Sequence, residues 1–298
     1  MCMFSLDPIT FFMKRAFGYT GFILALATAQ TQGDAATPAE QYQALLKQND
    51  GVAYVYFHAT NDTERQTIVE RVDTATVRLL DLVEQNSKEP FALEALTHIV
   101  TQEYWLNTYT SHRGWGKESP QARAIALLLR DHLQSDRLGE TCKRVSSGFR
   151  QECATFLRTV LEKSPHREVQ GEACLRLAQF LDGRMQKLDL LKEQPELARR
   201  YEGLFGMDYI QTLRSRDRAE VMNEAEALYE RASETYGDVK LPYNETVGEV
   251  ARTDLFEIRH LAVGKMAPEI ESDDQDGRPL KLRNYRGNVV LLYFWSEF

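Results

Sequence analysis

The chain has 298 residues, of which 43% are hydrophobic and 27% charged, and its formal net charge is −8. This composition is typical of a globular protein and excludes a disordered or fibrous chain, and the length leaves room for two domains. The acidic balance argues against nucleic acid as a partner, because neutralising phosphates requires a positive face, and the body of the chain has no basic cluster larger than a pair such as Lys143-Arg144.

The N-terminus has the features of an export signal. Lys14-Arg15 precede an apolar run from Ala16 to Ala29, which ends in the small-x-small pattern of a signal-peptidase site. The run is about 14 residues long, shorter than the roughly 20 residues that a membrane-spanning helix needs. We predict that residues 1–34 are a signal peptide, with the true start at Met13 and cleavage near Ala29. The protein would then be periplasmic or otherwise extracytoplasmic in a bacterium, with no stable membrane span after cleavage. An anchor that stays attached is the alternative.

The helical region begins at about Ala36 and runs to Leu261, because apolar residues recur there at spacings of three and four. Helices are expected over residues 39–48, 64–86, 91–104, 168–181 and 248–260, and apolar stripes indicate others at 125–133, 153–161 and 221–236. For the last of these, Asp217 with Glu220 resembles a capping box and Gly237 supplies a C-terminal break. Ala53–His58 is the exception, since its composition favours a strand.

Several helix–turn–helix units within residues 35–260 resemble one another. Residues 79–96, 128–142 and 156–177 share apolar positions, although the spacing between the units is irregular. We predict a mainly α fold built as an irregular helical-hairpin array, loosely similar to tetratricopeptide repeats, with a concave face for a protein partner. A plain irregular helical bundle is the alternative.

Three cysteines lie beyond the leader: Cys142, Cys153 and Cys174. They form no Cys-x-x-Cys pair, so neither a zinc knuckle nor a redox dithiol is predicted. Cys153 and Cys174 occupy core positions in helical patterns, which favours small buried hydrophobic side chains. One disulfide and one free thiol is the alternative.

No metal or cofactor site is predicted. The six histidines are scattered, and no phosphate-binding glycine loop or nucleophile elbow is present. The stretch from Ser272 to Gly277 resembles the start of a calcium loop, but the twelfth position is Arg283 where a glutamate is needed. This stretch is therefore interpreted as a solvated turn.

The composition of the sequence changes near residue 261, since glycine and proline are frequent in the segment that follows. We therefore place a domain boundary there. Residues 262–270 are expected to form a loop leading into an edge strand, and Leu280–Leu282 a short strand. Turns are expected at 273–278, around Asp276-Gly277, and at 283–287. The apolar run Val289–Phe294 predicts a buried central strand.

Three pieces of this segment occur in a characteristic order. They are Val263-Gly264-Lys265-x-Ala267-Pro268-Glu269-Ile270, then Asp276-Gly277-Arg278-Pro279-x-Lys281-Leu282, then Tyr285-Arg286-Gly287-Asn288-Val289-Val290-Leu291-Leu292-x-Phe294-Trp295. Together they resemble the opening of a redoxin domain of the TlpA/ResA type, within the AhpC/TSA group of thioredoxin-fold proteins. An edge strand of some other small fold is the alternative.

The resemblance implies that residues 261–298 are the first strands of a truncated α/β thioredoxin-like domain. In the family, Phe-Trp is followed by two variable residues, an aromatic residue and then Cys-x-x-Cys. Here Phe294-Trp295 is followed by Ser296-Glu297 and the aromatic Phe298. The catalytic cysteines are therefore expected just past Phe298, and Trp295 and Phe298 are expected to flank the active site.

In such a domain the first cysteine lies at a helix N-terminus, which stabilises its thiolate, and the second cysteine resolves the mixed disulfide. The intact protein would thus exchange thiols and disulfides on other proteins, as an antioxidant or oxidoreductase without a cofactor, whereas this chain alone should be inactive. Peroxiredoxins belong to the same group but carry Pro and Thr after the strand, and neither follows Trp295. A second hypothesis is that the helical array is a protein-binding scaffold and the redoxin segment is vestigial.

Overall fold

The structure is a computed structural model that describes residues 36–109, 119–274 and 276–293. The predicted signal peptide, residues 1–34, lies outside the described residues. The described part is mainly helical, as predicted, and contains only a small two-stranded sheet. None of its helices combines the length and the apolar composition that crossing a bilayer requires.

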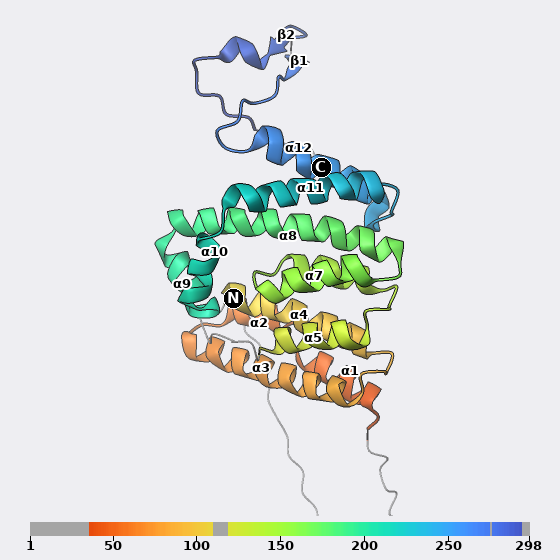
Figure 1. Ribbon diagram of the computed structural model, residues 1–298. Coiled ribbons are helices and arrows are strands. Elements are labelled where there is room, and N and C mark those ends of the chain that lie inside the picture. Colours follow the sequence, from red (N-terminus) through yellow and green to blue (C-terminus); the bar gives the residue numbers. More distant parts are fainter. Residues whose placement is uncertain (1–35, 110–118, 275, 294–298) are drawn as a thin grey trace, which may run out of the picture. The chain divides into compact units, whose positions relative to one another are not determined.

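The helices follow one another along the chain (Figure 1). They are α1 (Pro38–Gln48), α2 (Val52–His58), α3 (Asp62–Gln85), α4 (Ala92–Tyr109), α5 (Pro120–Asp131), α6 (Leu138–Ser146), α7 (Gln151–Lys163), α8 (Arg167–Glu193), α9 (Pro195–Phe205), α10 (Met207–Arg214), α11 (Arg218–Thr235) and α12 (Val247–Phe256). Short helical turns are η1 (Pro242–Asn244), η2 (Glu257–Leu261) and η3 (Leu282–Tyr285), and the strands are β1 (Glu271–Asp273) and β2 (Pro279–Lys281).

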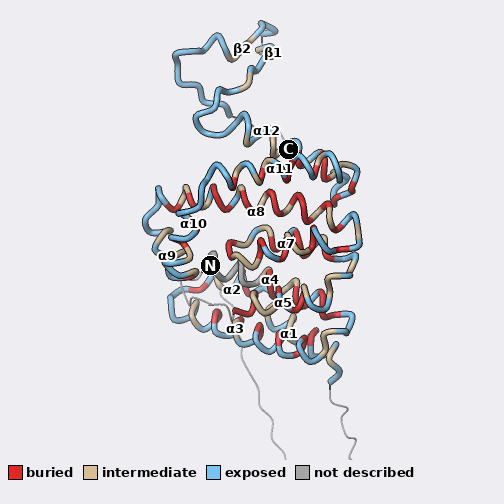
Figure 2. Tube along the Cα trace, in the orientation of Figure 1, coloured by how far each residue is buried: buried red, intermediate tan, exposed pale blue. Residues whose placement is uncertain are grey.

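The longest helix, α8, occupies the middle of the packing. It contacts α7 and α6 on one side and α11 on the other (Figure 1). Figure 2 shows buried residues on the faces of α7, α8 and α11 that pack together. The predicted stripes supply this core: Cys153, Phe156 and Val160 of α7 are fully buried, as are Ala225 and Ala232 of α11. The apolar residues that recur with the 3.6-residue period of a helix thus form one continuous hydrophobic core.

The strand expected at Ala53–His58 is wrong, because these residues belong to helix α2. Val52 and Tyr56, four residues apart, pack against Ile68, Val69 and Val72 of α3. Tyr54 and Phe57 are exposed instead. A strand would have placed Val52, Tyr54 and Tyr56 on one face. The packing of Val52 and Tyr56 against α3, with Tyr54 exposed, fits a helix instead. This contact outweighs the β-branched and aromatic composition of the segment, which favours a strand.

The start signal expected for the helix over 221–236 is confirmed in part. Asp217 is the N-cap of α11, but its carboxylate accepts a hydrogen bond from the amide of Ala219, not from that of Glu220, so there is no capping box. The break at Gly237 is confirmed, since α11 ends just before it. The next helix, α12, does begin with a capping box, formed by Thr246 and Glu249.

The cysteines are core residues. Cys142, Cys153 and Cys174 are all buried, and none of the three is in a disulfide. The Cys174 thiol donates a hydrogen bond to the carbonyl oxygen of Leu228, 3.4 Å away, across the packing of α8 against α11. The interpretation as small buried hydrophobic side chains is confirmed, and the alternative of a disulfide is wrong for these described residues.

Candidate functional site

The C-terminal segment after Leu261 forms a small antiparallel hairpin. Strands β1 and β2 pair with Glu271 opposite Lys281 and Asp273 opposite Pro279. The predicted turn lies between them. The Asp274 carboxylate accepts hydrogen bonds at 2.9 Å from the amides of Asp276 and Arg278, and Gly277 has a φ of 75°. A positive φ favours glycine, which explains the Asp-Gly pair at this position.

Charged side chains connect the hairpin to the residues around it. Arg283, in η3, forms ion pairs with Glu269 and Glu271, and Lys281 forms a third with Glu271. The backbone adds a hydrogen bond of 2.9 Å from the amide of Leu282 to the carbonyl oxygen of Ile270. The ion pairs are exposed and each stabilises weakly, so the segment depends on backbone pairing more than on burial.

The buried strand expected at Val289–Phe294 is wrong for the residues that the structure describes. Val289–Tyr293 has no regular secondary structure, and Val289, Leu291 and Tyr293 are 102%, 90% and 81% exposed. An apolar run becomes a central strand only where other strands pair with both of its edges and further elements cover its faces. No described strand pairs with this run. The predicted flanking residues, Trp295 and Phe298, lie outside the described residues.

A groove of 1110 Å³ opens on the helical part. Its walls come from α8, α11, α12 and η2 and from the residues that follow η2. The acidic residues that line it are Asp182, Asp189, Glu193, Glu226, Asp254 and Glu257, and the basic ones are Arg218 and Lys265. Since Asp189 already pairs with Arg218, the groove keeps an excess of negative charge.

Two half-buried carboxylates lie in this groove. Burial raises the pKa of Asp182, and the negative charge of Asp254 raises it further. Burial also raises the pKa of Asp254, although hydrogen bonds from Gln179 and Tyr229 oppose this. The amides of Gln186 and Gln179 donate to Asp182 and Asp254 respectively, each at 2.8 Å. No sequence pattern predicts this pair, because α8 and α12 are far apart along the chain.

Among the described residues, the helical part offers no reactive thiol and no cluster of metal ligands. Burial raises the pKa of the Cys174 thiol to about 11 and that of the Cys142 thiol further still. A thiol with a raised pKa is a poor nucleophile, because the thiolate is the reactive form. The described part also contains no group of three or more His, Cys, Asp or Glu side chains that could hold a metal ion.

Comparison with known protein families, curated proteins and solved structures finds no match to this chain. Its function therefore has to be inferred from the residues themselves. The two features that carry such an inference are the exposed apolar run that follows the hairpin and the acidic groove between α8, α11 and α12.

Proposed function

We propose that residues 261–298 are the opening of a thioredoxin-like redoxin domain, and that the protein carries out thiol–disulfide exchange outside the cytoplasm when that domain is whole. The observation that carries the proposal is the order of elements in the described segment. A hairpin with an Asp-Gly turn is followed by a short helical turn, η3, and then by the apolar run Val289–Tyr293. The same order is implied by the resemblance to redoxin domains.

The exposure of the run supports the proposal. Val289, Val290, Leu291, Leu292 and Tyr293 are all exposed. Burying a side chain of this kind is worth about 1.5–3 kcal/mol, so a protein rarely leaves five of them in a row in water. Further strands and helices of a thioredoxin-like sheet are the elements that would cover them. In that arrangement Val289–Tyr293 becomes the central strand, and Trp295 and Phe298 lie beside the dithiol.

The 298-residue chain contains no Cys-x-x-Cys pair, and its helical cysteines are buried. It should therefore be inactive by itself in thiol–disulfide exchange. The proposed substrates of the whole protein are proteins that carry accessible thiols or disulfides. A disulfide oxidoreductase is favoured over a peroxiredoxin, because neither Pro nor Thr follows Trp295 in this sequence.

The proposal is tested by extending the protein with the residues encoded after the codon for Phe298. The extension should begin with Cys-x-x-Cys, and the extended protein should catalyse the reduction of insulin by dithiothreitol. The 298-residue chain, and the extended protein with both of these cysteines replaced by serine, should not. A stop codon directly after Phe298, or turnover by the 298-residue chain, would contradict the proposal.

A second candidate function is that of a binding scaffold, and the acidic groove favours it. Consecutive helices pack in pairs, α3 with α4, α4 with α5 and α7 with α8, which supports a degenerate helical-hairpin array. The excess of carboxylates in the groove would suit a partner segment with lysine or arginine beside apolar side chains.

This candidate is tested by fluorescence anisotropy with the full chain and a labelled peptide of alternating Lys and Leu blocks. Binding should weaken with salt and should be several-fold weaker in a Glu193→Gln/Glu257→Gln variant. Glu234→Gln, an exposed carboxylate of α11 outside the groove, is the matched control. Equal binding of a Glu/Leu peptide would exclude the scaffold interpretation.

A further inference from the structure

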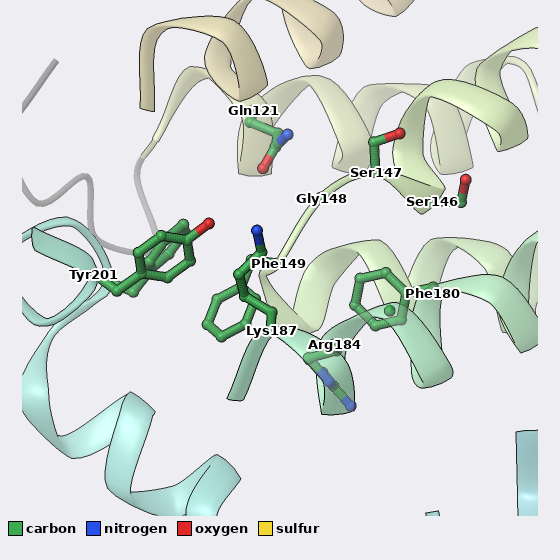
Figure 3. Close-up of a pocket in the computed structure, with 11 residues that line it drawn as sticks. Gln121, Ser146, Ser147, Gly148, Phe149, Phe180, Arg184, Lys187 and Tyr201 are labelled. Atoms are coloured by element: carbon green, nitrogen blue, oxygen red, sulfur yellow. The ribbon is translucent and has the colours of Figure 1, made fainter. Parts of the chain in front are cut away.

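A second, smaller cavity of 190 Å³ lies within the helical part (Figure 3). Its residues come from α5, from the last residue of α6 and the loop that follows it, and from α8 and α9. Among them are Gln121, Phe149, Phe180, Arg184, Lys187 and Tyr201. The cavity is separate from the hairpin and from the apolar run, so a ligand site in it is independent of the proposed redox function.

The cavity is cationic in a protein whose net charge is −8. None of the described residues that line it is acidic, and two of them, Arg184 and Lys187, carry positive charge. The Arg184 side chain is only 2% exposed, and its Nε and Nη2 have no hydrogen-bond partner in the described part. A buried cation without a carboxylate partner is costly, so a nearby anion would stabilise it.

The polar atoms of the cavity converge on its middle. Figure 3 shows the Lys187 nitrogen, the Tyr201 hydroxyl and the Gln121 amide oxygen turned toward one another. The Gln121 amide nitrogen donates to the carbonyl oxygen of Val100 at 3.2 Å, which orients the oxygen toward the cavity. The Lys187 Nζ lies 5.9 Å from the centre of the Tyr201 ring. No carboxylate lies within ion-pairing distance of Lys187 among the described residues.

The Arg184 guanidinium has a different role. It lies at the floor of the cavity and points away from its middle (Figure 3), 4.8 Å from the centre of the Phe180 ring. The guanidinium therefore cannot donate a hydrogen bond to a ligand in the middle of the cavity. It contributes positive potential beneath the site, while Lys187 supplies the direct contact.

The aromatic walls are held in place by one another. The Phe149 ring lies edge-on to Tyr201, with centroids 5.2 Å apart, and 5.0 Å from the ring of Phe205. The Tyr209 hydroxyl donates to the carbonyl oxygen of Phe149 at 2.9 Å, which anchors the loop. Walls fixed in this way form a site before a ligand arrives, as small-molecule sites usually do.

The volume limits the size of the ligand. A cavity of about 150 Å³ lined by apolar side chains holds a benzene molecule in another protein. A cavity of 190 Å³ therefore has room for one aromatic ring with a small substituent and is too small for a nucleotide or a second ring.

We propose that this cavity binds a small carboxylic acid anion that carries a single aromatic ring. Its carboxylate lies between Lys187 Nζ and the Tyr201 hydroxyl, both of which donate hydrogen bonds to it. Its ring lies against Phe149 and Phe180. A carboxylate fits better than a phosphate, because one ammonium and a few hydroxyls offer too few donors to replace the hydration of a dianion.

The experiment is isothermal titration calorimetry of the full chain with benzoate, benzyl alcohol and benzylamine. Benzoate should bind with one site per chain, and the neutral alcohol and the cationic amine should bind at least tenfold more weakly. Lys187→Met should weaken benzoate by about tenfold or more, the effect expected for losing a charge-assisted hydrogen bond. Lys192→Met is the matched control, because Lys192 lies on the same helix, pairs with Asp189 and does not line the cavity.

A second binding variant and a folding control complete the experiment. Tyr201→Phe should weaken benzoate several-fold, and the thermal unfolding of each variant should show that it is folded. The proposal is overturned if benzoate fails to bind at millimolar concentration or binds Lys187→Met as tightly as the unchanged protein. Binding of butyrate as tightly as benzoate would overturn the assignment of an aromatic ligand.

Discussion

Gly171 of α8 lies directly against Tyr236 at the end of α11. A Cβ placed on Gly171 would come within 2.9 Å of the Tyr236 Cβ and within 3.2 Å of the Val239 side chain. Gly171 is buried, and α8 and α11 share the most extensive packing in the helical core. The absence of a side chain at Gly171 is therefore what lets these two helices meet closely here.

Gly171→Ala should lower the free energy of unfolding by about 1–3 kcal/mol, because the added methyl group has to displace Tyr236 or separate the helices. Urea unfolding followed by circular dichroism measures this. Gly183→Ala is the matched control on the same helix, since a Cβ there meets nothing within 4 Å. It should be neutral or stabilise by about 0.5–1 kcal/mol through helix propensity. Equal effects of the two variants would contradict the close contact.

The carboxylate of Asp182 should make the stability depend on pH. Its pKa in the folded protein is raised above the ordinary value of 3.8 by burial and by Asp254, so the folded state holds this proton more tightly than the unfolded state. This contribution to stability is fully present below the unfolded pKa and is lost as the pH rises through the folded pKa. At pH 7 the charged Asp182 therefore destabilises the fold.

Asp182→Asn should raise the Tm at pH 7 by about 1–3 °C, and the difference from the unchanged protein should shrink toward zero near pH 3.5. Differential scanning calorimetry at the two pH values measures it. Asp136→Asn, at an exposed position between α5 and α6, is the matched control for the same substitution outside the groove. A constant or reversed difference for Asp182→Asn would show that the carboxylate is not destabilised in the folded state.

The buried cysteines should be unreactive in the native protein. Cys142 and Cys174 are fully buried and have raised pKa values, so both access and thiolate formation are opposed. Labelling with iodoacetamide at pH 8, read out on tryptic peptides, should modify Cys142, Cys153 and Cys174 only after unfolding in urea. Rapid native labelling of any of the three would show that the core around it opens easily.

The apolar run should promote self-association of the 298-residue chain. Leu291 is 90% exposed within a row of exposed apolar residues, and contiguous apolar surface is a site of association. Leu291→Glu should reduce the fraction of oligomer in sedimentation velocity and leave the Tm unchanged. Met266→Glu is the control, because Met266 is an exposed apolar residue of the same segment that lies outside the run. An equal reduction by both variants would argue against a specific role for the run.

Local patterns predicted most of the helical part. The helix expected over 39–48 is α1, and that over 64–86 is α3, because their apolar spacing matches a single buried face. The Asp-Gly turn was equally predictable, since Gly277 adopts the positive φ that few other residues tolerate. The helix expected over 168–181 runs on to Glu193 as α8, because Met185, Leu188 and Leu191 continue its buried face.

The two incorrect strand predictions have the same cause. At Ala53–His58 the composition favoured a strand, but contact with α3 selected a helix. At Val289–Phe294 the composition again predicted a buried strand, yet the described residues of this run are exposed. In both cases the state of the segment depends on which distant elements lie against it, and intrinsic preference is too weak to decide between the possibilities.

The sequence by itself determined the mainly helical character, the N-terminal limits of several helices and the turn of the hairpin, because each depends on residues within about ten positions of one another. Only the tertiary structure decided where polar groups meet. Gln121, Lys187 and Tyr201 come from three different helices, and Asp182 and Asp254 from two. No local spacing brings them together, since their distances are set by how the helices pack.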